Sequence, residues 1–338
     1  MRQRLASLAG LREQVQRQVA ELLPVDGPWA LVDFPNYPNV GDSAIYLGQL
    51  ACFRALRRPA PAYVSDIRGF DAGVMRRRVG RGPILLTGGG GFGDAWPTGH
   101  ALRESILDQF PGNPIVQLPQ SLHFRERSAL ERTRRIVNAH PDFTLLVRDR
   151  RSHELAGNEF HARAALCPDM AFCLGPLERT RRPGTPVLWL ARTDKESATP
   201  TLPGDAPRAD WRTEGSLPIR NLIWRLTSMA KWPGLGPLVR PLAASLYEPL
   251  ARQRLRRGLD LLGSARVLIT DRLHGHILAL LLGIPHVTMD NSTGKLSAFH
   301  EAWTAGIEGV RWADTAEEAW NLACDLADQD DPSAVARA

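Results

Sequence analysis

Short apolar runs, each followed by a segment of helical length, recur along this chain. Runs of four or five leucine or β-branched residues separated by helices are typical of buried strands in a parallel sheet. The runs lie at 30–34, 83–87, 115–118, 143–147, 187–191, 266–270 and 286–289. The pattern predicts an α/β fold with parallel sheets.

The clearest strand–helix–strand unit lies near the C-terminus. A strand at 267–270 is followed by Asp271, a residue type that caps helices, and by an apolar helix at 272–282. Gly283 ends that helix, and the next strand begins at His286.

The segment 176–186 is rich in Pro, Gly and Arg and has no apolar period, which predicts a linker between two α/β halves. We therefore expect four parts. They are an N-terminal amphipathic helix (1–27), a first α/β domain (28–178), a second (186–312) with a basic helical insertion at about 212–262, and a C-terminal helix and tail (313–338).

Composition narrows the class of protein. With 43% hydrophobic residues in 338, the chain is globular, and its longest apolar stretch, at 277–282, is far short of the roughly 18 residues of a membrane span. The charged N-terminus does not resemble a signal peptide, and the four cysteines show no C-x-x-C spacing. These features predict a cytoplasmic protein with reduced thiols.

The formal charge of +6 suits an anionic partner, which a phosphorylated substrate, a membrane surface or a nucleic acid would each provide. No helix-turn-helix, zinc or aromatic–arginine pattern is present, so nucleic acid is not expected.

Polar and glycine-rich segments follow six of the predicted strands. Because ligands bind at the carboxyl ends of parallel strands, we expect these segments to meet in a cleft between the two halves. The segments are 35–42, 88–94, 117–124, 148–152, 271–276 and 290–295. Their candidate cleft or acceptor-binding residues are Asn39, Gly41, Asp42, Gly89, Gly90, Gln120, His123, His276 and Asn291.

The glycine run at 88–91 suits either an anion cradled by backbone N–H groups or a tight turn between strand and helix, and the sequence leaves both open. It matches neither a Walker A motif nor a clean dinucleotide fingerprint.

The segment DRLHGH at 271–276 carries the sharpest chemical signal. Arg272 suits a phosphate or carboxylate, His274 can donate a proton near neutral pH, and a helix N-terminus favours anions. The structural alternative is that Asp271 caps the helix and pairs with Arg272 while His274 is a buried core residue. His274 and His276 point apart on a helix, so no metal site is expected.

Taken together, these motifs resemble the polysaccharide pyruvyl transferase family. The resemblance covers about 33–303 and is weakest between 200 and 259. It rests on NVGD at 39–42, the glycine run within 88–94, PQSLHF at 119–124, VRD at 147–149, PD at 168–169, TDRLHG at 270–275 and Lys295.

The resemblance implies two Rossmann-like domains in a GT-B-like arrangement with a cleft between them. It also implies transfer of the enolpyruvyl-derived group of phosphoenolpyruvate to sugar hydroxyls of an exopolysaccharide or its lipid-linked precursor, with release of phosphate. Phosphoenolpyruvate is then a co-substrate, and no cofactor is expected.

Carried over by position, the resemblance places Arg148 and Arg272 on the phosphoenolpyruvate anion, with the Leu273 backbone and Lys295 beside it, and gives His274 the role of acid. Asp42 and Asp94 are candidates for removing hydroxyl protons, although either residue also suits a helix cap. The alternative function is a nucleotide-sugar-dependent glycosyltransferase of similar architecture, with the arginine–histidine pair on a diphosphate.

The basic insertion has no counterpart in the resemblance. Its pattern predicts either an amphipathic helix at the inner face of an anionic plasma membrane or a helical lid or dimer surface. The residues concerned are Leu222, Ile223, Trp224, Leu226, Met229 and Trp232, interleaved with Arg220, Arg225 and Lys231. The oligomeric state is left open.

Overall fold

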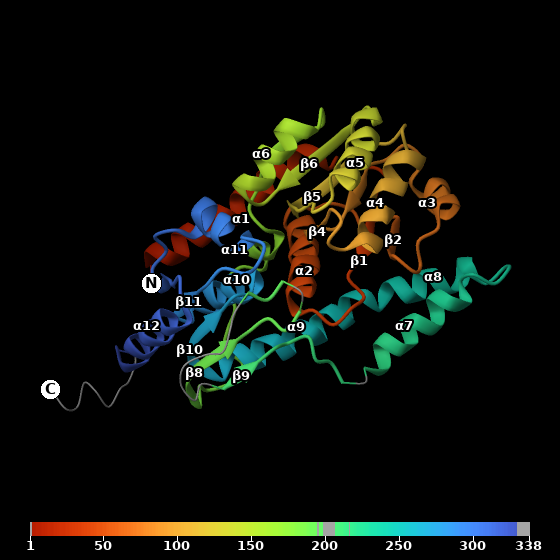
Figure 1. The fold of residues 1–338 in the computed structure, drawn as a ribbon. Coiled ribbons are helices and arrows are strands. Elements are labelled where there is room, and N and C mark those ends of the chain that lie inside the picture. Colours follow the sequence, from red (N-terminus) through yellow and green to blue (C-terminus); the bar gives the residue numbers. More distant parts are fainter. Residues whose placement is uncertain (1, 195, 199–206, 216, 330–338) are drawn as a thin grey trace.

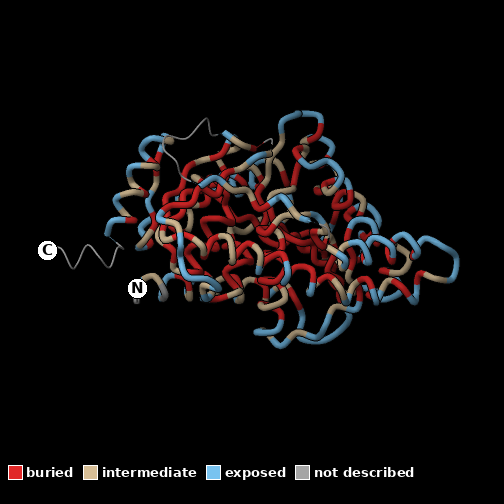
Figure 2. The backbone as a smooth tube through the Cα atoms, turned by 90° about the horizontal axis from the view of Figure 1, so that it is seen from below, coloured by how far each residue is buried: buried red, intermediate tan, exposed pale blue. Residues whose placement is uncertain are grey.

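The computed structural model describes residues 2–194, 196–198, 207–215 and 217–329, and two parallel sheets form its centre (Figure 1). Helices cover both sheets, and the buried residues lie in the interior (Figure 2), where the largest apolar cluster includes residues from both halves of the chain. The prediction of an α/β fold with parallel sheets is confirmed.

The first sheet has seven strands, all in parallel pairs. Its spatial order is β2 (Tyr63–Asp66), β1 (Ala30–Phe34), β3 (Ile84–Leu86), β5 (Ile115–Leu122), β6 (Phe143–Val147) and β7 (Arg163–Leu166), with β4 (Gly89–Phe92) added beside β5. The apolar runs predicted β1, β3, β5 and β6. They missed β2 and β7, which are edge strands of four residues with few branched side chains.

The second sheet has five parallel strands in the order β12 (Val310–Trp312), β11 (His286–Thr288), β10 (Ala265–Thr270), β8 (Thr185–Leu190) and β9 (Arg208–Ala209). The central strands β10, β8 and β11 were predicted. The edge strands β9 and β12 have two and three residues, too few for a periodic signal.

The glycine run forms a strand and not the tight turn between strand and helix that was one of its two predicted roles. Gly89–Phe92 is β4, and it lies beside an extended β5 that includes most of the segment 117–124, which was expected to follow a strand. A Cβ atom on Gly88 would lie 2.5 Å from the Pro119 carbonyl oxygen. Glycine therefore allows this segment to pass close to the neighbouring strand.

The helices that flank the first sheet are α1 (Arg2–Leu22), α2 (Val40–Ala55), α3 (Ala72–Val79), α4 (Pro97–Gln109), α5 (Arg127–Ala139) and α6 (Arg150–Glu159). The segment Met170–Leu174 is a short 3-10 helix. The apolar side of α1 enters the main core through Leu8, Val15 and Val19.

The later helices include α10 (Leu273–Leu282), α11 (Lys295–Phe299) with a π-helical turn at His300–Thr304, and α12 (Ala316–Gln329). Residues 330–338 of the predicted tail lie outside the described residues.

The basic insertion forms three helices, α7 (Pro218–Met229), α8 (Gly236–Ser245) and α9 (Tyr247–Gly263). Helix α9 runs along α2, and α7 and α8 form a hairpin that projects at the right of Figure 1. Arg254 on α9 donates to the Pro35 carbonyl oxygen at 3.2 Å, and the Asp66 N–H donates to the Tyr247 hydroxyl at 3.1 Å. The insertion is therefore anchored to the loops of the first sheet.

The contact between α9 and α2 depends on Gly258. A Cβ atom at this position would lie 2.2 Å from Cγ1 of Val40, which is fully buried at the start of α2. We expect Gly258→Ala to lower the free energy of unfolding by about 1–3 kcal/mol, because the added methyl group would overlap the buried side chain of Val40. Thermal unfolding would measure the change.

A matched substitution tests the cause of this loss. In the Val40→Ala background, Gly258→Ala should cost much less, because the clashing methyl groups are absent. Equal losses in both backgrounds would show that the close contact with Val40 is not responsible.

Candidate active site

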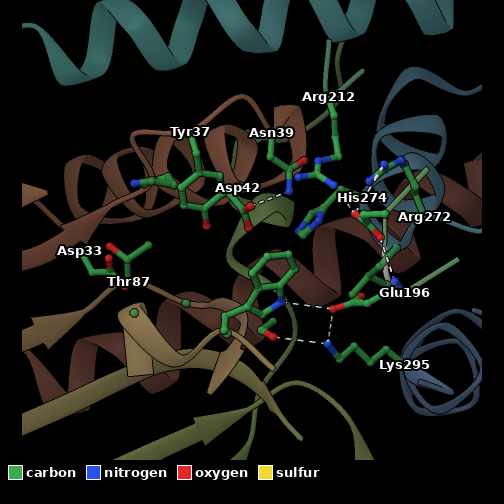
Figure 3. Close-up of a pocket in the computed structure, with 18 of the residues that line it drawn as sticks. Asp33, Tyr37, Asn39, Asp42, Thr87, Glu196, Arg212, Arg272, His274 and Lys295 are labelled. Atoms are coloured by element: carbon green, nitrogen blue, oxygen red, sulfur yellow. Dashed lines mark hydrogen bonds and ion pairs between the residues drawn. The ribbon is translucent and has the colours of Figure 1, made fainter. Parts of the chain in front are cut away.

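A cavity of about 390 Å³ lies between the carboxyl ends of the strands of the two sheets. Its walls come from the segments that follow β1, β2, β3, β6, β8, β9, β10 and β11, so all of the predicted segments except 117–124 contribute (Figure 3). Of the candidate residues, the cavity is lined by Asn39, Asp42, Gly90, Arg148, Arg272, Leu273, His274, Asn291 and Lys295.

Asp169 contacts a basic side chain from each half of the molecule. Arg148, at the end of β6, donates from Nη1 to Asp169 Oδ2 at 2.7 Å, and His274 Nε2 lies 3.5 Å from the same oxygen. Although burial opposes its ionisation, His274 and Arg148 hold the pKa of Asp169 well below its usual range. Sequence analysis noted Asp169 only as part of a short motif and missed this role.

His274 lies in the first turn of α10 and faces the start of α2. A Cβ atom on Gly41 would lie 2.5 Å from His274 Nδ1, so glycine at position 41 is needed for the imidazole to fit. Gly41 therefore shapes the site without lining the cavity. The Nε2 atom is buried and has no hydrogen-bond partner among the described residues.

Arg272 is the N-cap residue of α10 and reaches Asp210, with its Nη2 atom 2.6 Å from Oδ1. Its guanidinium carbon lies 5.9 Å from the ring centre of Trp211. Burial lowers the pKa of Arg272, against the opposing effect of Asp210. The Oδ1 atom of Asp271 accepts a hydrogen bond from the backbone N–H of Arg192, while Arg272 is the N-cap residue of α10 and pairs with Asp210.

Lys295 belongs to a second cluster of paired charges. Its Nζ atom donates to Glu196 Oε1 at 3.1 Å and to the Gly90 carbonyl oxygen at 3.3 Å. Arg192 holds the other carboxylate oxygen of Glu196 at 3.0 Å and also binds Asp194. Burial lowers the pKa of Lys295. Burial also acts to raise the pKa of Glu196, but the charges of Lys295 and Arg192 keep that pKa below its usual value.

Most partners in these clusters were not predicted from the sequence. Arg192, Asp194 and Glu196 follow β8, and Asp210 and Arg212 follow the two-residue strand β9. Neither of these two segments contains a recognisable sequence motif. Their position after a strand end was the one feature of the sequence that indicated a role in the site.

Gly90 marks the point where cations from the two sheets approach each other. A Cβ atom there would lie 3.3 Å from Arg148 Nη2 and 3.5 Å from Lys295 Nζ. A small anion at this point would be within reach of both side chains, because glycine leaves the space open.

The start of α2 contributes the polar side of the cavity. Asn39 caps the helix by accepting a hydrogen bond from Gly41 N–H at 3.1 Å, and its amide donates to Asp42 Oδ2 at 2.6 Å. Asp42 is therefore oriented by Asn39 and lines the cavity close to His274 (Figure 3).

Two candidate residues have structural roles away from the cavity. Asp94 accepts hydrogen bonds from the backbone N–H groups of Arg125 and Glu126, so its carboxylate orders the chain before α5. His276 is fully buried, with Nδ1 2.7 Å from His286 Nε2 and Nε2 2.8 Å from the Thr304 hydroxyl. His276 thus faces the core side of the apolar helix α10, Asp94 lies in the turn between β4 and α4, and we retain neither residue as part of the site.

The remaining candidates lie behind the cavity wall. Gln120 is fully buried on β5 behind the glycine strand, and its amide atoms have no hydrogen-bond partner among the described residues. Gly89 and His123 also lie outside the cavity lining. Burial lowers the pKa of His123, and the charge of Lys295 acts in the same direction.

Comparisons with known proteins identify the family. A family model for polysaccharide pyruvyl transferases matches residues 39–293. Pyruvyl transferase 1 of Schizosaccharomyces pombe is 34% identical over 295 residues, which are 83% of this chain and 71% of that protein. EpsO of Bacillus subtilis is 29% identical over 323 residues, which are 94% of this chain and 97% of EpsO.

A solved structure supports the fold. The crystal structure of a functionally uncharacterized protein from Klebsiella pneumoniae matches with a TM-score of 0.61 at 17% identity, and the match covers 90% of this chain and 99% of that one.

The class of protein is defined by its two sheets of parallel strands, which helices cover, and by the charged side chains that line the cavity between the carboxyl ends of those strands. Within that class, the chain belongs to the polysaccharide pyruvyl transferase family, a family of enzymes. The resemblance noted from its motifs is thereby confirmed.

The buried pair of His276 and His286 predicts a pH-dependent stability. Burial lowers the pKa of His286 to about 4 and that of His276 well below its ordinary value, so both are neutral in the folded protein. The unfolded chain takes up protons below pH ~6.5, so stability should be complete above this pH and fall towards pH 4, by about 1.4 kcal/mol per pH unit for each histidine. Thermal unfolding between pH 7.5 and 4.5 measures the slope.

A double substitution, His276→Gln with His286→Gln, should flatten this slope because it removes both titrating groups. His153→Gln, at an exposed position on α6, is the control and should leave the slope unchanged. An unaltered slope in the double variant would assign the pH dependence to other groups.

Proposed function

We propose that this protein transfers the enolpyruvyl-derived group of phosphoenolpyruvate to sugar hydroxyls of an exopolysaccharide or its lipid-linked precursor, forming a pyruvate ketal and releasing phosphate. One observation carries the proposal: Arg148 and His274, from opposite sheets, meet at Asp169 beside the amine of Lys295. Family membership supplies the reaction class.

The charges of phosphoenolpyruvate match the cations of the cavity. Its phosphate and carboxylate need two or three cations in a site with little water. Arg148 and Lys295 flank Gly90, and Arg272 approaches from the start of α10, where the backbone of Leu273 also lines the cavity. Each of these cations is already paired with a carboxylate, so a bound donor would replace part of an existing charge network.

In the proposed reaction His274 protonates the methylene carbon of phosphoenolpyruvate. Asp169, at 3.5 Å, would stabilise the imidazolium before this transfer. A sugar hydroxyl then attacks the neighbouring carbon, and phosphate leaves with the electron pair of its C–O bond. A second hydroxyl closes the ketal. Each of the two sugar hydroxyls loses a proton. Asp42, the nearby carboxylate, first accepts a hydroxyl proton. In the net reaction one of the two protons restores the imidazolium of His274, and the other leaves with phosphate or solvent.

The two sheets with a cavity between their strand ends fit two Rossmann-like domains in a GT-B-like arrangement, which we propose as the finer description of this fold. A nucleotide-sugar-dependent glycosyltransferase of the same architecture would use the same cations for a diphosphate. The choice between the two functions therefore depends on which ligand is bound.

A ligand panel tests the donor. We expect phosphoenolpyruvate to raise the thermal unfolding temperature, and nucleotide sugars to leave it unchanged, because the cations around Gly90 and His274 suit a small anion. Arg272→Ala should abolish the shift, whereas Arg150→Ala, at an exposed position on α6, should preserve it. Stabilisation by nucleotide sugars and not by phosphoenolpyruvate would establish the alternative function.

His274→Ala separates chemistry from binding. Without the acid, release of phosphate should fall by roughly 10²–10⁴-fold while phosphoenolpyruvate still raises the unfolding temperature. His153→Ala removes an exposed histidine and serves as the control. Turnover retained in His274→Ala would remove this residue from the acid role.

The hairpin of α7 and α8 supports a further part of the proposal, peripheral contact with an anionic membrane at its cytoplasmic face. Ile223 and Leu226 are buried, but Trp232, in the turn between α7 and α8, is 64% exposed, and Leu238, near the start of α8, is 74% exposed. From 217 to 247 the chain has four basic residues and no Asp or Glu. Arg220 and Arg240 pair with Glu214 and Asp71, whereas Arg225 and Lys231 are exposed, so anionic lipid complements the charge of these two. No helix among the described residues is long and apolar enough to cross a membrane.

Vesicle sedimentation tests the membrane contact. The protein should bind phosphatidylglycerol vesicles and not phosphatidylcholine vesicles, and Trp232→Glu with Leu238→Glu should abolish the binding. Val25→Glu changes a side chain that is 60% exposed outside the hairpin and should have no effect. Equal binding by the hairpin variant and the original protein would contradict a role of this hairpin.

A further inference from the structure

The end of the cavity away from Arg148, Arg272 and Lys295 has a different chemical character. Asp33 and Thr87 lie there, across the cavity from Arg272 and Lys295 (Figure 3). Tyr37 and Ile67, which are 52% and 36% exposed, line the same cavity. A carboxylate, a hydroxyl and apolar side chains suit a polyhydroxylated ligand better than an anion.

The backbone at Asp33 has a conformation that non-glycine residues seldom adopt. Its φ angle is +72°, and the pairing of β1 with β2 shifts register between Val32 and Phe34. Such a conformation costs of order 1–3 kcal/mol and persists where the surrounding structure imposes it. Here it accompanies a carboxylate that lines the cavity at the end of a strand.

Arg103 fixes the Asp33 carboxylate. Its Nη2 atom lies 2.7 Å from Asp33 Oδ2, and the guanidinium also donates to Gln117 Oε1 at 3.1 Å and to the Thr87 carbonyl oxygen at 3.3 Å. Within the described part of the chain, the Thr87 hydroxyl is buried without a hydrogen-bond partner. A carboxylate held by Arg103 through Oδ2 and a hydroxyl with unused hydrogen-bonding capacity therefore line the same end of the cavity.

The electrostatic setting favours a neutral partner for Asp33. Burial raises the pKa of Asp33 against the opposing charge of Arg103, and the nearby carboxylates of Asp42 and Asp66 raise it further. A second anion would add to this repulsion, whereas a sugar hydroxyl would donate a hydrogen bond to the carboxylate.

We infer that Asp33, Thr87 and Tyr37 form the acceptor subsite, which binds a pyranose ring of the saccharide. Asp33 accepts a hydrogen bond from a sugar hydroxyl, Thr87 hydrogen-bonds a second one, and the ring packs against Tyr37. The inference rests on the proposed function for the identity of the acceptor, and it makes Asp33 a residue that determines specificity. Sites built to hydrogen-bond a hydroxyl discriminate strongly against ligands that lack it.

Saturation-transfer NMR with methyl pyranosides of glucose, galactose and mannose tests the subsite without phosphoenolpyruvate. At least one sugar should receive saturation from the protein, and Asp33→Asn should weaken its binding at least tenfold. Asp26→Asn, at an exposed position before β1, is the control and should bind as the original protein does. Absence of binding by all three sugars, or equal binding by Asp33→Asn, would overturn the inference.

Thr87→Val is a second test in case Asp33→Asn fails to fold. It keeps the ion pair of Asp33 with Arg103 and removes only a hydroxyl. It should weaken saccharide binding several-fold with an unchanged unfolding temperature. In both variants phosphoenolpyruvate should still raise the unfolding temperature as in the original protein. Loss of that shift in the variants alone would place these residues in the donor site and overturn the inference.

Failure of the original protein to respond to phosphoenolpyruvate would instead contradict the proposed function. Saccharide binding that still depends on Asp33 would then continue to support the subsite, so the two ideas are tested separately.

Discussion

The contact of Asp169 with both Arg148 and His274 is the interaction around which the cavity is built. The carboxylate is completely buried, and a buried charge is stable only when it is paired and hydrogen-bonded. Arg148 belongs to the first sheet and His274 to a helix that follows a strand of the second. Leaving Asp169 unpaired would cost free energy, and this cost favours the relative position of the two sheets that brings Arg148 and His274 to the same carboxylate.

Glycine determines how closely the parts around this contact approach. Gly41 admits the ring of His274 at the start of α2, Gly90 leaves space beside Arg148 and Lys295, and Gly258 allows α9 to pack on Val40. In each case a side chain would occupy the volume that a functional group or a helix now fills. The polar cavity thus depends on close backbone packing as much as on charge.

The cavity balances its charges within itself. The cations near Gly90 and α10 are paired with Glu196, Asp194 and Asp210, while Asp33 at the opposite end is paired with Arg103. A site of this kind stays stable without a ligand and presents a cationic end and an acidic end to its substrates. The arrangement suits an enzyme that brings an anionic donor and a neutral saccharide together.

Local patterns in the sequence determined the central strands and the apolar helix α10, and they drew attention to Arg148, Arg272, His274 and Lys295, because these residues lie in the segments that follow buried strands. Edge strands of two to four residues gave no periodic signal, and a run of glycines suggested a loop where a strand forms. Only the tertiary structure separated His274, which faces the cavity, from His276, which faces the core one half-turn away. It also brought Asp33, Asp169, Glu196 and Asp210 into the site, because their partners are distant in the chain and pairing between buried charges depends on the packing of the two sheets.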